Sequence, residues 1–134
     1  MSTQPVQVPK LLVIDANVFF AKRLSDALKG EGFDVVHSTQ SSYGLTMLEW
    51  DPPAAILCST NLRELPAFEI PPIVHADPKT AHIPVIAMGD GDDQALMAAF
   101  RAGCADYVDR RLGPNNIATH VRAFLRSQNE GFQP

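Results

Sequence analysis

Five short apolar runs, each followed by a more amphipathic segment, are the feature that most constrains the fold of this chain. Most of the runs are continuous rather than alternating, which indicates strands buried on both faces, as in a parallel sheet covered by helices. The second run is more amphipathic and suits an edge strand. The runs cover residues 10–15, 33–38, 54–59, 83–88 and 105–109. This β-α alternation predicts one doubly wound α/β domain.

Helical periodicity fills the segments between the runs. Apolar residues recur at helical spacing and predict helices over 17–29, 40–50, 92–102 and 114–127. Between residues 66 and 82 the pattern is less regular. Pro71 and Pro72 limit the helix there to a short one that begins near the prolines.

Composition and charge narrow the class of protein. The 134 residues, 46% hydrophobic and 19% charged, suit one globular domain over 10–127, with a flexible lead over 1–9 and a tail or linker over 128–134. A net charge of −4 argues against a nucleic-acid binder that works through a broad basic face. Neither end resembles a signal peptide, no apolar run is long enough to span a membrane, and Cys58 and Cys104 lie in apolar contexts. We therefore expect a cytoplasmic protein with reduced, buried thiols.

Several fragments, in this order, resemble the receiver domain of bacterial response regulators, the CheY-like fold. LLVIDAN is similar to the first strand of that family, and GFDVVHSTQSSYGLTML to its second strand and second helix. DPKTAHIPVIAM is similar to the loop into the fourth strand, and AFRAGCADYV to the fourth helix and fifth strand. The resemblance covers residues 10–127 and implies a three-layer α/β/α fold with a five-stranded parallel sheet in the order 2-1-3-4-5. It also implies a role in two-component, phosphorelay signalling.

The resemblance places the phosphoacceptor pocket on residues that differ from those of the family. Asp15 and Ala16 stand where the family has paired acids, and Ser59 stands where it has the acceptor aspartate. Asn61 completes this remnant of the acidic pocket. A serine would form a stable phosphate ester rather than a labile acyl phosphate, and its hydroxyl would need a base to become a nucleophile.

The switch and metal positions differ as well. Gly89 stands where the family has Thr or Ser, Arg110 replaces a lysine, and Tyr107 keeps the switch aromatic. Because Mg²⁺ needs carboxylates, and Asp15 has at most Asp90 to help it, we expect Mg²⁺ binding to be weak or absent, with no other cofactor. We predict instead that Arg110 pairs with Asp15 in place of metal and phosphate.

The favoured interpretation is a pseudo-receiver, a non-enzymatic module that binds a protein partner without being phosphorylated. The resemblance implies a partner face on the fourth helix, fifth strand and fifth helix. Met97 and Phe100 match core positions of the family, which leaves Leu96 turned outward. The expected partner is a protein, with a second copy of the chain as one option, and neither nucleic acid nor membrane is contacted directly. The face would comprise Leu96, Arg101, Tyr107, Arg111, His120 and Arg122.

Three alternatives stay open at this point. The chain would be a working phosphorelay receiver if an atypical acceptor were phosphorylated, and a sensor if a small ligand occupied the same crevice. A serine hydrolase has less support, because the stretch LCSTN lacks the G-x-S-x-G elbow. The four histidines are scattered and show no metal-ligand spacing.

Overall fold

The structure is a computed structural model that describes residues 8–62 and 66–130. Within these residues, five parallel strands pair in the order β2-β1-β3-β4-β5, so the predicted doubly wound sheet and its strand order are confirmed. The strands are β1 (Lys10–Ile14), β2 (Asp34–Ser38), β3 (Ala55–Ser59), β4 (Val85–Gly89) and β5 (Asp106–Asp109).

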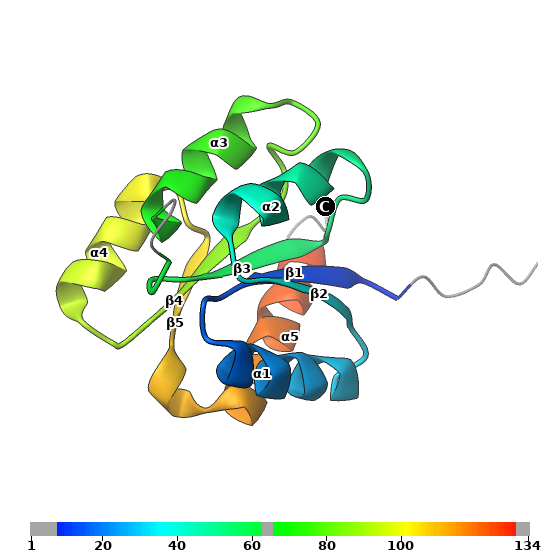
Figure 1. The fold of residues 1–134 in the computed structure, drawn as a ribbon, viewed down its shortest axis with the longest axis vertical. Helices are drawn as coiled ribbons and strands as arrows, with labels where there is room; N and C mark the ends of the chain where they lie inside the picture. Colours follow the sequence, from blue (N-terminus) through cyan, green and yellow to red (C-terminus); the bar gives the residue numbers. More distant parts are fainter. Residues whose placement is uncertain (1–7, 63–65, 131–134) are drawn as a thin grey trace, which may run out of the picture.

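Helices cover both faces of the sheet and give the predicted three layers. In Figure 1, α1 and α5 lie on one face, and α2, α3 and α4 lie on the other. Among the described residues no helix has the length and apolar character needed to cross a membrane. The helices are α1 (Val18–Gly30), α2 (Ser41–Thr46), α3 (Ile70–Ala76), α4 (Asp93–Ala102) and α5 (Pro114–Glu130), with 3-10 turns η1 (Met47–Glu49), η2 (Ala67–Glu69) and η3 (Arg110–Leu112).

The helix ends follow from local chemistry. The side chain of Asn17 accepts from the Phe20 amide at the start of α1, and the side chain of Asp92 accepts from the Gln94 amide at the start of α4. α3 begins at Ile70 with prolines in its first turn, where helical amides have no acceptor within the helix. The short third helix near the prolines is therefore confirmed.

Two helices end at other residues than expected. The helix predicted over 40–50 ends at Thr46 and continues only as the 3-10 turn η1. α5 runs to Glu130, so the helix itself continues past residue 127, where it was expected to end. The rest of the expected tail, 131–134, and residues 1–7 of the expected lead lie outside the described residues.

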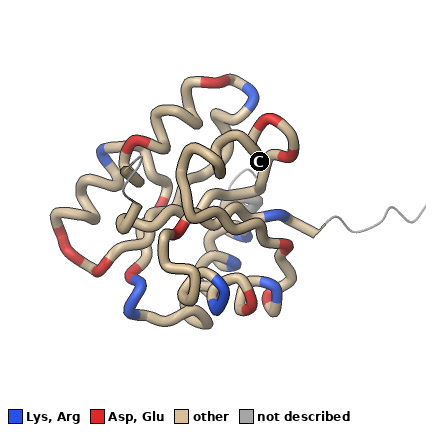
Figure 2. Tube along the Cα trace, viewed as in Figure 1, with Lys and Arg blue, Asp and Glu red and all other residues tan. Residues whose placement is uncertain are grey.

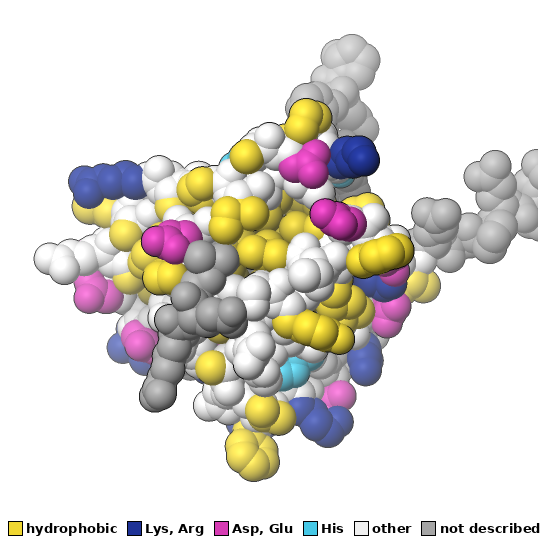
Figure 3. All heavy atoms as spheres, turned by 45° about the horizontal axis from the view of Figure 1, so that its top comes forward, with side chains coloured by type: hydrophobic (Ala, Val, Ile, Leu, Met, Phe, Trp, Pro, Cys, Tyr) yellow, Lys and Arg dark blue, Asp and Glu magenta, His cyan; other side chains and the backbone are white. Residues whose placement is uncertain are grey.

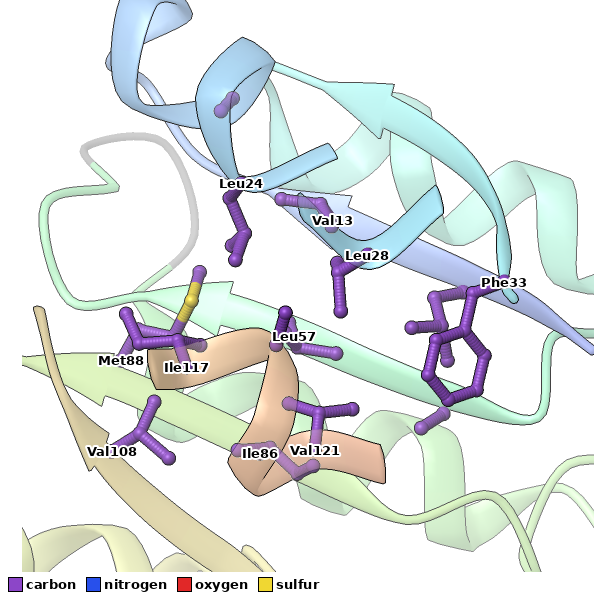
Figure 4. Close-up of a cluster of buried hydrophobic side chains, with 14 residues drawn as sticks. Val13, Leu24, Leu28, Phe33, Leu57, Ile86, Met88, Val108, Ile117 and Val121 are labelled. Atoms are coloured by element: carbon purple, nitrogen blue, oxygen red, sulfur yellow. The ribbon is translucent and has the colours of Figure 1, made fainter. Parts of the chain in front are cut away.

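The core consists of two apolar layers that hold the sheet between them. Figure 4 shows the layer under α1 and α5, where Leu24 of α1 and Ile117 of α5 pack on Leu57 of β3. Residues of α3 and α4, among them Ile70 and Ala99, form the layer on the other face. All five residues of β3 are buried, so this strand is a rigid central support for whatever lies at its carboxyl end.

The two cysteines belong to the second layer. Both are free and buried, as expected. Burial raises the pKa of the Cys58 thiol well above its ordinary value and raises that of Cys104 to about 11. Both thiols therefore stay protonated and unreactive near neutral pH.

Candidate functional site

The candidate site lies where three strands end. Asp15 directly follows β1, Ser59 is the last residue of β3, and Arg110 directly follows β5. Parallel strands bring their carboxyl ends to the same edge of a sheet, and the pairing of Ile14 with Cys58 sets Asp15 beside Ser59. Asp15 and Ser59 are both fully buried.

Arg110 joins the two buried positions. Its Nη1 donates to Asp15 Oδ2 over 2.6 Å and to Ser59 Oγ over 2.5 Å. The predicted ion pair between Asp15 and Arg110 is therefore present. The guanidinium carbon also lies 4.1 Å from the ring centroid of Phe20, a cation–π contact that fixes the plane of the group. With only 14% of its side chain exposed, Arg110 points into the protein.

The Asp15 carboxylate accepts hydrogen bonds at both oxygens. Oδ1 accepts from the Asn17 amide over 2.8 Å and from Asn61 Nδ2 over 2.9 Å, in addition to the Arg110 contact at Oδ2. Ala16 contributes only its backbone amide, which donates to Asn61 Oδ1 over 3.3 Å. In the described part of the chain no group of three metal-ligating side chains comes together. A carboxylate with three donors has little left to offer a cation.

A second set of contacts fixes the loop that follows β4. The ring of Tyr107 lies against Gly89, so that a Cβ at Gly89 would overlap the Tyr107 hydroxyl. The same hydroxyl accepts from the Gly91 amide over 3.1 Å. A Cβ at Gly91 would in turn overlap Arg111 and Asp109, which pair with each other over 2.8 Å. Side chains of β5 and η3 thus cover Gly89 at the end of β4 and Gly91 in the loop that follows it.

The opposite charges of Asp109 and Arg111 favour their position over Gly91. The hydrogen bonds from Arg111 hold the pKa of the Asp109 carboxyl below its usual range, and Asp109 raises the pKa of Arg111. Both groups therefore carry their charge across the physiological range, and their attraction is maintained. Asp90, the acid that could help Asp15 to hold Mg²⁺, is exposed rather than turned into the pocket.

On α4, the exposed side chains differ in part from those expected for the partner face. Leu96 is exposed as expected, but the placement of Met97 and Phe100 in the core is wrong, because they are 54% and 50% exposed. The small Ala99 occupies the buried side of α4 in their place. Three apolar side chains, rather than one, therefore reach the surface of α4.

Arg122 does not lie with the others. Its Nη1 donates over 2.9 Å to Glu31, which caps the end of α1, so Arg122 faces α1 rather than β5. His120, in contrast, contacts Asp106 of β5 over 2.6 Å. Arg101 and Arg111 are exposed. Arg122 is therefore on the opposite side of α5 from the other residues of the expected face.

Sequence reasoning did not find three of the site's contacts: the Phe20 ring under Arg110, the bond from Gly91 to Tyr107, and the approach of His37 Nε2 to the Asp15 carbonyl oxygen at 3.0 Å. None of these three contacts has a signal in the sequence. A fourth contact does: Asn17, whose amide donates to Asp15, is of a residue type that favours helix N-termini.

Comparison with known proteins places this geometry in a family context. No protein-family model matches the chain. It is 27% identical over 121 residues to the DNA-binding response regulator MtrA of Mycolicibacterium smegmatis, a match that covers 90% of this chain and 52% of the relative. The chain thus spans about half the length of the curated relatives it matches.

Solved structures agree with the sequence matches. A putative response regulator from Chloroflexus aurantiacus superposes with a TM-score of 0.83 at 25% identity, covering 90% of this chain and 99% of the other. A CheY-like receiver domain from Methanospirillum hungatei superposes with a TM-score of 0.82 at 16% identity, covering 93% and 99%. Fold and sequence together support a response-regulator receiver domain.

Proposed function

We propose that this CheY-like receiver domain works in two-component signalling as a pseudo-receiver, by contact with a protein partner and without accepting a phosphoryl group. The observation that carries the proposal is the position of Arg110, whose Nη1 contacts both Asp15 and Ser59. These are the positions that resemble the metal-binding acid and the phosphoacceptor of the family. Here a cationic side chain of the protein itself fills the space between them.

The chemistry at Ser59 supports this proposal. Its Oγ accepts hydrogen bonds from Arg110 Nη1 and from the Asn61 amide at 3.3 Å, and both partners are donors. A hydroxyl nucleophile needs a base to take its proton, and the hydrogen bonds of Ser59 Oγ within the described residues both come from donors. The ester that attack would form is too stable to serve a reversible signal.

The loop after β4 supports it as well. In a receiver that responds to phosphate, this loop would move when the acceptor is modified. Here Tyr107 and the Asp109–Arg111 pair cover Gly89 and Gly91. These contacts support the proposal that the protein itself holds the loop in the arrangement that a partner recognises.

The proposal extends to partner, location and class. The partner is a protein that binds α4, β5 and α5, where Leu96, Met97 and Phe100 are exposed on α4. MtrA is named as DNA-binding, but charged residues of both signs are interspersed along this chain (Figure 2), so we propose no direct DNA contact for this domain. We further propose that it is cytoplasmic, requires no cofactor and is not an enzyme.

Treatment with acetyl phosphate and Mg²⁺, followed by intact-mass spectrometry, tests the proposal. We expect no added phosphate, while a receiver domain with a complete acidic pocket, treated in the same buffer, should become phosphorylated. Beryllofluoride with Mg²⁺ should likewise leave the amide NMR spectrum unchanged. A hydroxylamine-labile phosphate on any carboxylate near Asp15 would overturn the proposal, and a stable phosphate on Ser59 would favour the atypical-acceptor alternative.

A further inference from the structure

Trp50 is the single tryptophan of the chain, and 84% of it is exposed. It follows η1 and precedes β3, so it lies at the amino ends of the strands, the opposite edge of the sheet from Asp15. An indole ring is costly to leave in water, and tryptophan is enriched at the centres of protein interfaces. Its position suggests a function for this edge that the Arg110 site does not provide.

The indole lines a hollow between two loops. The hollow has a volume of about 470 Å³ and lies between the η1–β3 connection and the α3–β4 loop. Its lining residues are Leu48, Glu49, Trp50, Pro52, Asp77, Lys79 and Thr80. This volume is within the range of sites that hold a small molecule or a single large side chain. Figure 3, which looks toward the face carrying α2 and α3, shows acidic and basic groups beside hydrophobic ones at this edge.

The charges of the lining are not balanced. Glu49 and Asp77 contribute two carboxylates and Lys79 one ammonium, and no ion pair within the described residues involves any of the three. Asp77 Oδ1 accepts from the Lys79 amide over 2.9 Å, which leaves its other oxygen available. The neighbouring Asp51 is paired with Lys10 and adds no net charge. The hollow therefore has a net negative charge next to an aromatic face.

We propose that this hollow binds an arginine side chain presented by a partner protein. A planar guanidinium stacks on an indole face through cation–π attraction, which is strongest for tryptophan. Its N–H groups at the same time donate to carboxylates such as Glu49 and Asp77. An anionic ligand would meet like charge here, and a wholly apolar one would leave both carboxylates unused. The proposal is independent of whether Ser59 or any carboxylate is phosphorylated.

Because Trp50 is the only tryptophan, its fluorescence reports on the hollow alone. The probe is the blocked tripeptide acetyl-Gly-Arg-Gly-amide, titrated at low ionic strength while acrylamide quenching of Trp50 is measured. We expect saturable protection of Trp50 from acrylamide. The same peptide with citrulline, which keeps the shape and loses the charge, should bind about 5-fold or more weakly. Equal protection by both peptides, or none by the arginine peptide, would refute the proposal.

Variants separate the site from general charge effects. Glu49→Gln combined with Asp77→Asn should weaken the arginine peptide about 10-fold. Asp26→Asn combined with Asp93→Asn, which removes the same charge elsewhere, should leave binding unchanged. Lys79→Gln should tighten binding, because it removes a like charge. Trp50→Ala, followed by NMR because it lacks the fluorophore, should abolish binding while the fold persists. If the control pair weakens binding as much as the Glu49 and Asp77 pair, the contact is nonspecific and the site does not exist.

Discussion

At the scale of single residues, Arg110 is the side chain whose loss should change the domain most. It neutralises a carboxylate with 0% exposure, and its removal would leave Asp15 charged in an apolar setting with only neutral donors. Removing one partner of a buried pair costs far more than the intact pair contributes.

We therefore expect Arg110→Met to lower the free energy of unfolding by about 3 kcal/mol, measured by urea denaturation followed by circular dichroism. Arg126→Met is the matched control, because Arg126 is exposed and takes part in no ion pair within the described residues, and it should shift stability by less than about 0.5 kcal/mol. An Arg110→Met protein as stable as the control would mean that the pair contributes little.

The pair with Asp15 was predictable because a lone buried carboxylate and a cation at the carboxyl ends of two strands of one parallel sheet have few other partners. The Phe20 contact was not predictable, because helical periodicity shows which face of a helix carries a ring but not which side chain the ring contacts. Arg122 lies on α5 as expected, but the partner face implied by the resemblance put it toward β5, whereas it donates to Glu31 at the end of α1.

At the scale of elements, the β4–α4 loop depends on two glycines and one tyrosine. We expect Gly89→Thr to lower the free energy of unfolding by about 1 to 3 kcal/mol, because the new side chain needs the space of the Tyr107 ring. Tyr107 should also leave its position, which would appear as a loss of the hydrogen bond that protects the Gly91 amide from exchange.

Combining Gly89→Thr with Tyr107→Ala should restore part of the loss, and this non-additivity identifies the contact itself as the cause. Gly30→Ala is the control, since a Cβ at Gly30 meets no atom within 4 Å. It should be neutral or slightly stabilising. Additive effects of the two substitutions would show that Tyr107 does not restrict Gly89.

The strands were predictable within one or two residues because continuous apolar runs have few other interpretations. Helix ends were less so: α2 stops at Thr46 although the apolar pattern continues, and α5 continues after its apolar stripe ends. The exposure of Met97 and Phe100 was missed because family positions record where a helix usually turns, and here the small Ala99 faces the sheet instead.

At the scale of the whole molecule, two apolar layers share one sheet, and both thiols belong to the same layer. The pKa of Cys104 rises from 9.0 to about 11 on folding, so the folded state holds this proton more tightly than the unfolded state. The stabilisation is complete below pH 9 and is lost as the pH rises toward 11. Unfolding should therefore become easier across that interval.

We expect the free energy of unfolding to fall by on the order of 1 kcal/mol between about pH 8 and pH 10 through Cys104. Circular dichroism is the suitable probe, since Trp50 is already 84% exposed and its emission should change little on unfolding. Cys104→Ala should reduce the slope against pH. An identical slope in the variant would assign the effect to other groups.

Tyr107 and Arg111 cover Gly89 and Gly91, and these contacts limit which single substitutions the protein can tolerate. Placing an acid at Ser59 would leave Arg110 between two carboxylates, and placing a hydroxyl-bearing side chain at Gly89 would bring it against the Tyr107 ring. Exchanging Arg110 first leaves Asp15 without its cation. Each single step toward a pocket with the acids and hydroxyl of the resembled family is thus unfavourable alone, and an engineer who wants to build one must change several of these positions together.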